Sequence, residues 1–236
     1  MRNIRDFEIE QVYIDGQDQI KADAVPYRAE PLNLSHLNQF HHDAVQVEEL
    51  RCAVSDCIPV LGITADQLLT QEESYSPARE TDNLEGDSAQ DLAKIVYLNR
   101  YANGRPQIAY CRGFGLKRGA LASSIAHDSH NIIAISHSDA DLACALNALI
   151  DKKGGIAICA DGELSCLPLP IGGIMSDQSG EQVARQYHDL VERARQLGCT
   201  SKAPFVALSF LSLIVIPELK IGERGLFRFS QFNWVD

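Results

Sequence analysis

The sequence is poor in positive charge and has no apolar stretch long enough to span a membrane. Its 21 Lys and Arg stand against 32 Asp and Glu, which leaves a formal net charge of −11. Nucleic-acid-binding proteins gather Lys and Arg on a basic face. A transmembrane helix needs roughly 20 apolar residues, whereas the longest run here, residues 205–216, is interrupted by Ser209 and Ser212. We therefore expect no nucleic acid and no membrane among the partners.

The sequence also lacks paired cysteines. Its seven cysteines are scattered without a C-x-x-C pair, which argues against a zinc site built on cysteine. Most lie in apolar stretches, as Cys144 and Cys159 do, so we expect reduced and buried thiols. The first residues, MRNIRDFEIE, contain no apolar segment of the kind a signal peptide needs. Together these features predict a cytoplasmic protein.

The opening segment predicts a small β-hairpin. Residues 7–20 read FEIEQVYIDGQDQI, in which two β-prone runs flank Asp15-Gly16, a strong signal for a two-residue turn. A stretch punctuated by proline follows. We therefore assign residues 1–34 to a separate β-segment and residues 35–236 to the main domain.

The first part of the main domain is polar. Residues 36–54 predict a polar helix, for which Ser35 is a suitable N-cap. Residues 70–91 carry seven acidic residues and a single basic one, Arg79, with almost no large apolar side chain. This composition predicts an acidic surface loop.

From residue 92 onward, short apolar runs alternate with helical patterns. Ser138 and a Ser179–Gln182 capping box mark the starts of two helices. The predicted elements are strands at 92–98, 107–114 and 131–136, a helix at 139–153, a hairpin at 155–169, a helix at 180–197 and a β-prone run at 204–222. This order predicts an α/β or α+β domain, in which a layered mixed β-sheet is flanked by helices.

Gly115, Lys117 and Arg118 belong to the run GFGLKRG, residues 113–119. Glycines beside two cations permit a close approach of the backbone. They could present the cations to an anionic or polar partner. The run could equally be a tight connection between strands, with solvated cations.

A second polar cluster is His127-Asp128-Ser129-His130-Asn131. His127, Asp128 and His130 could bind a divalent metal, since imidazole and carboxylate suit zinc, iron or manganese. They could instead form a hydrogen-bonded His–Asp unit for proton transfer. A third possibility is a structural network that satisfies buried backbone groups. The residues alone leave all three open.

Three long motifs resemble a known family. They read, in this order, RGFGLKRGALASSIAHDSHNIIAIS, LPLPIGGIMSD and LSFLSLIVIPELKIGERGLF. They are similar to the C-terminal domain of bacterial adenine deaminases, members of the amidohydrolase superfamily. The opening DFEIEQVYIDGQ resembles the β-segment that follows the barrel in that family.

The resemblance implies a part of a larger enzyme. The complete enzyme hydrolyses adenine to hypoxanthine and ammonia in purine salvage, using a divalent metal (manganese, iron or zinc) in a (β/α)₈ barrel. The barrel's metal ligands begin with an H-x-H pair, which is absent from the seven histidines here. A barrel of about 250 residues could not fit beside the domain described above. We therefore expect a C-terminal part without its own barrel metal, inactive alone.

The same resemblance implies the partners and the site. The partner would be a barrel-containing half or domain, adenine would be the substrate of the complete enzyme, and the assembly would be a homo-oligomer. The residues expected to face the active site are Gly115, Lys117, Arg118, His127, Asp128, Ser129, His130 and Asn131. An alternative is a stand-alone module that binds purine or metal without turnover. Another is an independent metal site in HDSH with its own hydrolytic activity.

Overall fold

The computed structural model describes residues 10–18 and 38–235, which belong to two compact units, residues 1–34 and 35–236. In the first unit, strands β1 (Tyr13–Ile14) and β2 (Gln17–Asp18) pair antiparallel. Asp15 and Gly16 between them adopt φ angles of 49° and 78°, as a type I′ turn requires. The predicted hairpin is confirmed.

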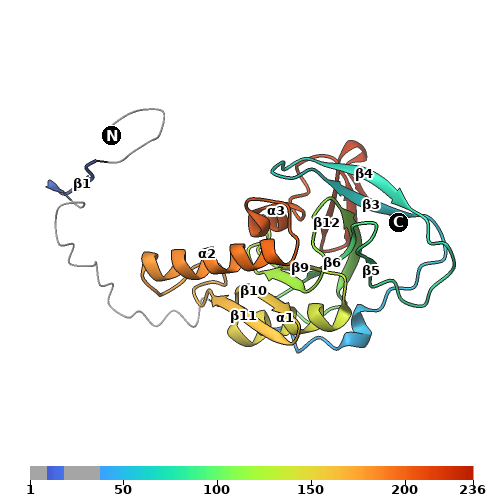
Figure 1. The fold of residues 1–236 in the computed structure, drawn as a ribbon, viewed down its shortest axis with the longest axis horizontal. Coiled ribbons are helices and arrows are strands. Elements are labelled where there is room, and N and C mark those ends of the chain that lie inside the picture. The colour runs from blue at the N-terminus through green and yellow to red at the C-terminus, as the bar shows by residue number, and fades with distance from the viewer. Residues whose placement is uncertain (1–9, 19–37, 236) are drawn as a thin grey trace. The chain divides into compact units, whose positions relative to one another are not determined.

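A mixed β-sheet of nine strands forms the centre of the second unit (Figure 1). Its strands are β3 (Ile58–Ile63), β4 (Thr70–Tyr75), β5 (Gly86–Asp87), β6 (Leu92–Leu98), β7 (Gln107–Arg112), β8 (Ala120–Ser123), β9 (Ile132–Ser136), β10 (Gly155–Ala160) and β11 (Glu163–Pro168). The order is β11-β10-β8-β9-β6-β7-β3-β4, with β5 also paired to β6. Only β3 and β7 run parallel; the other described neighbours are antiparallel.

Helices cover both faces of this sheet. The other elements in the described part of the second unit are α1 (Asp139–Lys152), α2 (Gly180–Gln196), α3 (Pro204–Phe210), 3₁₀-helices at Val47–Leu50 and Phe229–Gln231, and a small sheet of β12 (Leu219–Gly222), β13 (Gly225–Arg228) and β14 (Asn233–Trp234). Along β6, Ile95 packs with α2 and α3, whereas Val96 packs with α1. Successive side chains of a strand point to opposite faces, so β6 contributes to both cores. The predicted mixed α/β fold with flanking helices is confirmed.

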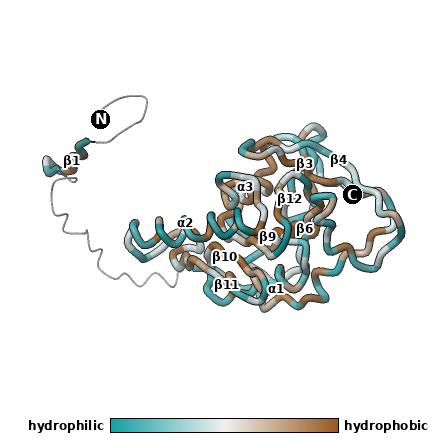
Figure 2. Tube along the Cα trace, in the orientation of Figure 1, coloured by the Kyte–Doolittle hydropathy of each residue, from teal (hydrophilic) through white to brown (hydrophobic). Residues whose placement is uncertain are grey.

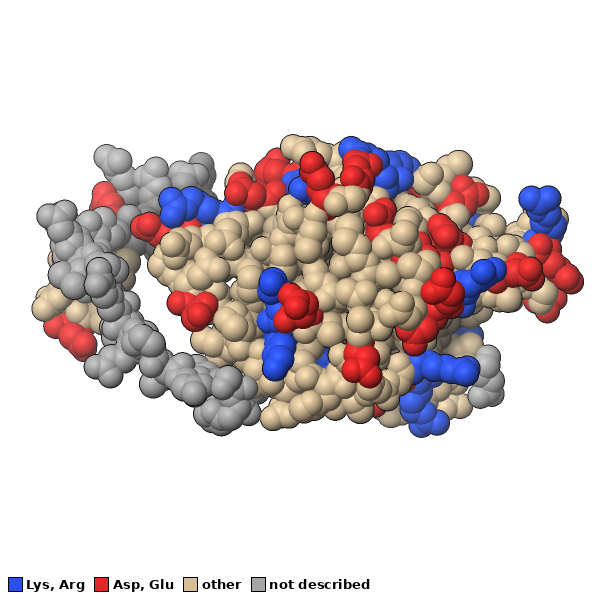
Figure 3. Space-filling view, turned by 90° about the horizontal axis from the view of Figure 1, so that it is seen from below, with Lys and Arg blue, Asp and Glu red and all other residues tan. Residues whose placement is uncertain are grey.

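The polarity of the elements follows this layering. In Figure 2 the central strands are largely brown, whereas α2 is largely teal. On the face shown in Figure 3, acidic and basic groups are interspersed. Within the described residues, no helix is both long and apolar enough to cross a bilayer.

Both predicted helix starts are confirmed. The Ser138 hydroxyl accepts a hydrogen bond from the backbone N–H of Asp141 at 3.3 Å. Ser179 and Gln182 form the capping box that begins α2. These bonds satisfy backbone N–H groups that have no partner within the first helical turn.

The predicted helix at residues 36–54 is wrong within the described range, where only Val47–Leu50 is helical and of the 3₁₀ type. Ser35, its expected cap, lies outside the described residues. The backbone of Val45 instead exchanges hydrogen bonds with the Asn147 side chain on α1, at 2.8 and 2.9 Å. Because tertiary partners satisfy this backbone, the segment has no need of helical hydrogen bonds.

The predicted acidic loop is wrong for residues 70–75 and 86–87, which are strands β4 and β5. β4 pairs with β3 over six residues and is the edge strand of the sheet. Its acidic side chains can therefore point to solvent, and Glu72 pairs with Arg228. Charge on an edge strand discourages pairing with another chain, so an acidic sequence is compatible with this strand.

The β-prone run at 204–222 is partly wrong, because residues 204–210 form helix α3. Pro204 stands at its first turn, where a missing N–H costs nothing. Phe205 and Leu208 are buried in the core against the sheet. Packing has overridden the local β-preference. Strands β3, β8, β13 and β14 were not expected from the sequence.

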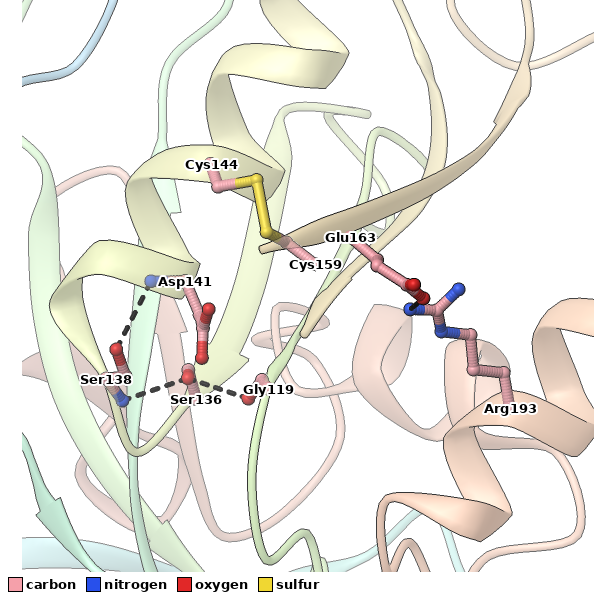
Figure 4. Close-up of a disulfide and its surroundings, with 8 residues drawn as sticks. All are labelled: Gly119, Ser136, Ser138, Asp141, Cys144, Cys159, Glu163 and Arg193. Atoms are coloured by element: carbon pink, nitrogen blue, oxygen red, sulfur yellow. Dashed lines mark hydrogen bonds and ion pairs between the residues drawn. A yellow bond between two sulfur atoms is a disulfide. The ribbon is translucent and has the colours of Figure 1, made fainter. Parts of the chain in front are cut away.

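The expectation of reduced thiols is wrong for Cys144 and Cys159, which form a disulfide in the structure. The bond joins α1 to β10, with Cα atoms 6.1 Å apart (Figure 4). The sequence showed two apolar surroundings but not that a helix and a strand would place the two Cβ atoms within bonding reach. The other five cysteines are free.

Candidate functional site

The two polar motifs lie at opposite ends of the sheet. β8 and β9 pair from Ala120–Ser136 to Ser123–Ile133. Residues 113–119 precede β8, whereas residues 125–131 connect it to β9. Three residue steps along a strand span about 10 Å, so the strands hold the motifs apart. We name the loops 99–104, 125–131 and 169–175 the histidine end, and the loops 63–69, 113–119 and 197–203 the lysine end.

The glycine amides at the lysine end already have a partner. The Asp91 carboxylate accepts hydrogen bonds from the backbone N–H groups of Gly113 and Gly115, both at 3.0 Å. Gly113 has a φ of 91°, and an added Cβ would lie 1.9 Å from the Ile63 carbonyl oxygen. Glycine is required there because only it tolerates this conformation and this contact. The loop is therefore built around an internal carboxylate.

The two cations of this loop are also engaged within the chain. Lys117 Nζ donates to the Ser88 carbonyl at 3.3 Å, and Arg118 forms an ion pair with Asp161. Both cations thus have a partner within the chain, and both contacts lie at the surface. His137 lies at this end too, with Nε2 2.8 Å from the Leu116 carbonyl oxygen. His137 is therefore separated from His127 and His130, which lie at the histidine end.

At the histidine end, the last residues of β6 hold the loop 125–131 in place. The Tyr97 hydroxyl lies 2.6 Å from Ser129 Oγ and accepts a hydrogen bond from Asn131 Nδ2 at 2.9 Å. Asn131 Oδ1 accepts from the Arg100 backbone N–H at 3.0 Å. Asn131 is almost fully buried, and both polar atoms of its side chain are satisfied. This network fixes the second half of HDSHN, as the structural interpretation proposed.

The segment around α3 holds the first half of the loop. The His127 N–H donates to the Ser209 carbonyl at 3.2 Å, and Ser212 Oγ donates to the His127 carbonyl at 3.1 Å. The His127 ring packs on Phe210, with centroids 4.6 Å apart. These serines belong to the third sequence motif, so that motif positions His127.

Arg100 connects the same end to the second motif. Its Nη1 donates to the Gly172 carbonyl at 2.8 Å, and its guanidinium lies over the rings of Phe40 and Tyr101 at 4.9 and 4.7 Å. Tyr101 donates its hydroxyl hydrogen to the Ser129 carbonyl at 3.0 Å. Parts of all three sequence motifs therefore meet at the histidine end, which the sequence alone did not show.

In the structure, HDSH forms neither a metal site nor a hydrogen-bonded His–Asp unit. His127 Nδ1 and Asp128 Oδ1 are 3.9 Å apart, too far for a hydrogen bond. The Asp128 side chain is 82% exposed. Among the described residues, no group of three or more His, Cys, Asp and Glu is placed to bind a metal. The divalent metal that the family resemblance implies therefore finds no fitting set of ligands in this part of the chain.

His130 occupies an unusual position in the loop. Its φ is 49°, and its Nδ1 is buried without a hydrogen-bond partner. Burial lowers its pKa below the ordinary 6.5, and the nearby His127 and Arg100 lower it further. The folded state thus favours the neutral ring.

We expect an NMR titration of His130 to give a pKa below 6.5. Because the folded pKa is depressed, the associated stability is present above pH 6.5 and is lost as the pH falls through the folded pKa. Between pH 7.5 and pH 5, the free energy of unfolding should fall by less in His130→Gln than in the wild type. An equal loss in both proteins would contradict this origin of the pH dependence.

A buried ion pair between Lys94 and Asp139 was not expected from the sequence. Lys94, in the middle of β6, has its Nζ 2.5 Å from Asp139 Oδ1 and 2.7 Å from the Leu50 carbonyl oxygen, and both charged side chains are buried. Asn83 Nδ2 donates to the second Asp139 oxygen at 2.8 Å. A lysine inside the apolar run LAKIVYL was the available signal, because a buried lysine needs a partner. This network positions the start of α1.

The comparisons with known proteins agree with the motifs. The family model described as the adenine deaminase C-terminal domain matches residues 67–233. Proteins named adenine deaminase from Methanosarcina barkeri and Methanosarcina mazei are 38% and 39% identical, each over 99% of this chain and 44% of their own length. One from a Sulfurovum species is 39% identical over 100% of this chain and 43% of its own length.

The chain spans less than half the length of the curated relatives that it matches. The matched family model covers most of the second unit, including all three motifs and the loops of the histidine end. The chain belongs to the adenine deaminase family and contains its C-terminal domain.

Proposed function

We propose that this chain acts as the C-terminal part of an adenine deaminase, together with a metal-binding barrel. The complete enzyme would convert adenine and water to hypoxanthine and ammonia. The observation that carries the proposal is the meeting of the three family motifs at the histidine end, around HDSHN. A domain that served only as a scaffold would need no such convergence on a polar, partly exposed loop.

The metal belongs to the barrel in this proposal. The described residues offer no fitting ligand set, and the chain contains no H-x-H pair. Manganese, iron or zinc would supply an activated water for the hydrolysis when bound in the barrel. Purine salvage and a homo-oligomeric assembly are parts of the same proposal and rest on the family resemblance. A cytoplasmic location is proposed as well, although the disulfide between Cys144 and Cys159 would be uncommon there.

The residues of this chain would shape the site rather than bind the metal. Asp128 and Ser129 are exposed residues of the loop, which Tyr97 and Asn131 hold in place through hydrogen bonds. The proposal places the surface nearest the substrate here and does not extend to Lys117 and Arg118, whose partners lie within the chain.

Ammonia release from adenine tests this proposal. The chain is produced alone and together with the part of the Methanosarcina mazei relative that lies outside the matched region. We expect no turnover by the chain alone and faster turnover by the pair than by the barrel part alone. Equal rates for the pair and the barrel part would contradict the proposal. A stand-alone binding module would be favoured if calorimetry showed that the chain alone binds adenine while neither the chain alone nor the pair turned adenine over.

A further inference from the structure

The structure combines one disulfide with free thiols, some of which reach the surface. Cys144 and Cys159 are joined, whereas the other five cysteines are free, and Cys57 among them is exposed. Thiols stay free in a reducing environment, where a permanent disulfide is rare. Disulfides that do occur there are mostly transient, with catalytic or redox-sensing roles. The bond between Cys144 and Cys159 is therefore a candidate for reversible opening.

The two cysteines of this bond differ in their access to solvent. Cys159, on β10, is 2% exposed, whereas Cys144, on α1, is only partly buried. Thiol–disulfide exchange begins when a thiolate attacks one of the two sulfurs, and access helps to decide which sulfur that is. A thiolate from solution should therefore attack Cys144 Sγ, and the sulfur of Cys159 should leave.

A third cysteine lies near the bond but is a poor competitor. The register of the β10–β11 hairpin pairs Cys159 with Leu164, and it pairs Ala157 with Cys166. Cys159 and Cys166 are therefore diagonal neighbours on one face of the hairpin, where both pack in the core formed with α1. Burial raises the pKa of the Cys166 thiol to about 11, so at neutral pH it keeps its proton and attacks a disulfide slowly. The bond should thus open to thiols from solution rather than rearrange within the chain.

Helix α1 connects the disulfide to two distant segments of the chain. Asp139, in its first turn, pairs with the buried Lys94 of β6. Asn147 exchanges two hydrogen bonds with the backbone of Val45. Cys144 lies between these two contacts along α1, so the disulfide fastens to β10 the helix that holds both. Opening the bond should loosen α1 and, with it, the segment that contains Val45.

We propose that Cys144 and Cys159 form a reversible redox site, which low-molecular-weight thiols open and the corresponding disulfides close. The state of the site sets how firmly α1 is held on the sheet. This inference goes beyond the proposed function, because it involves neither adenine nor a barrel partner. It also accounts for a disulfide in a chain that keeps an exposed free thiol.

The chemistry of the site is a two-electron exchange. A thiolate RS⁻ attacks Cys144 Sγ, the bond between the two protein sulfurs breaks, and the Cys159 thiolate takes a proton from solvent. A second RS⁻ attacks the outer sulfur of the mixed disulfide on Cys144, which releases RSSR, and the Cys144 thiolate is protonated in turn. In sum, one protein disulfide and two RSH give two protein thiols and one RSSR. The reverse sequence, with RSSR as the oxidant, closes the bond.

Alkylation after equilibration in glutathione buffers tests the site in the full chain. The folded protein is held at the redox poise of the cytosol and, in a second sample, at the more oxidising poise of the endoplasmic reticulum. Each sample is quenched with acid, and its free thiols are labelled in denaturant and mapped by peptide mass. We expect Cys144 and Cys159 to be labelled in the first sample and unlabelled in the second. A bond that persists at the cytosolic poise, or thiols that stay free at the oxidising poise, would overturn the proposal.

Hydrogen exchange measures the consequence for α1. Amides of α1 and of residues 44–50 should exchange about tenfold or more faster in the reduced protein than in the oxidised protein. Helix α2 packs on the other face of the sheet and is the internal control, with an expected change of less than about twofold. Equal exchange of α1 in the two states would overturn the link between the redox site and the helix.

Two single variants test which sulfur meets the thiol from solution. In Cys159→Ala, the free Cys144 should form a mixed disulfide with oxidised glutathione, seen as a mass gain on its peptide. In Cys144→Ala, the buried Cys159 should gain this mass at least about tenfold more slowly. The opposite order of rates would contradict the assigned order of attack.

Cys166→Ala is the matched control, because it removes the neighbouring thiol and keeps the disulfide. It should be reduced at the cytosolic poise and oxidised at the more oxidising one, as the wild type is. Loss of this response would show that Cys166 takes part in the exchange, which the proposal excludes. None of these measurements uses adenine, so their outcome is independent of the outcome for the proposed function.

Discussion

Replacing Asp139 with alanine should lower the free energy of unfolding by about 3–5 kcal/mol, because it leaves the Lys94 ammonium group buried without its counter-ion. Both side chains are inaccessible to solvent, at 0% and 1% relative exposure. Water therefore cannot replace the lost carboxylate. Urea unfolding of Asp139→Ala, followed by circular dichroism, measures the effect.

The double variant Lys94→Met/Asp139→Leu is the control for this prediction. Replacing both charges with apolar side chains of similar size removes the unpaired charge, and such replacements are often neutral or stabilising. We expect it to recover most of the stability that Asp139→Ala loses. A single variant as stable as the wild type would show that Lys94 finds another partner or loses its proton at little cost.

Reducing the disulfide between Cys144 and Cys159 should lower the free energy of unfolding by about 3 kcal/mol, because a cross-link over a loop of this length restricts the unfolded chain by roughly that amount. The two cysteines are 15 residues apart in sequence. Urea unfolding with and without reductant measures the difference. The bond fastens α1 to β10 (Figure 4), so hydrogen exchange should also increase in α1.

Two variants make this result specific. Cys144→Ala/Cys159→Ala should unfold at the same urea concentration with and without reductant. Cys52→Ser, which removes a free thiol, should respond to reductant as the wild type does. Titration of the unfolded, unreduced protein should find five thiols, as the five free cysteines require. Seven reactive thiols would contradict the disulfide.

Local sequence signals succeeded where hydrogen bonds to neighbours in the chain decide the structure. Asp15-Gly16 and Asp161-Gly162 both adopt the positive φ angles of hairpin turns, because few other residue pairs tolerate them. Ser138 and Ser179 begin helices because their hydroxyl groups reach the N–H three residues ahead. These features need no distant partner.

The same signals failed where a distant segment decides the structure. Residues 204–210 look β-prone and form α3, because Phe205 and Leu208 fill the core from a helix. The acidic residues of β4 look like a loop, but pairing with β3 satisfies their backbone while their side chains stay at the edge. Tertiary packing outweighs local propensities, which span only about 1 kcal/mol.

The candidate site divides in the same way. The sequence by itself determined the family, through three long motifs, and it singled out HDSHN as polar residues between apolar strands. Only the tertiary structure decided that HDSHN and GFGLKRG lie at opposite ends of the sheet. The two motifs flank β8, and the pairing of β8 with β9, and of β9 with β6, fixes the direction of β8 in the sheet. The tertiary structure also decided that Arg100, Tyr97 and Ser212 meet around HDSHN, since contacts between residues far apart in sequence arise only when the chain is folded.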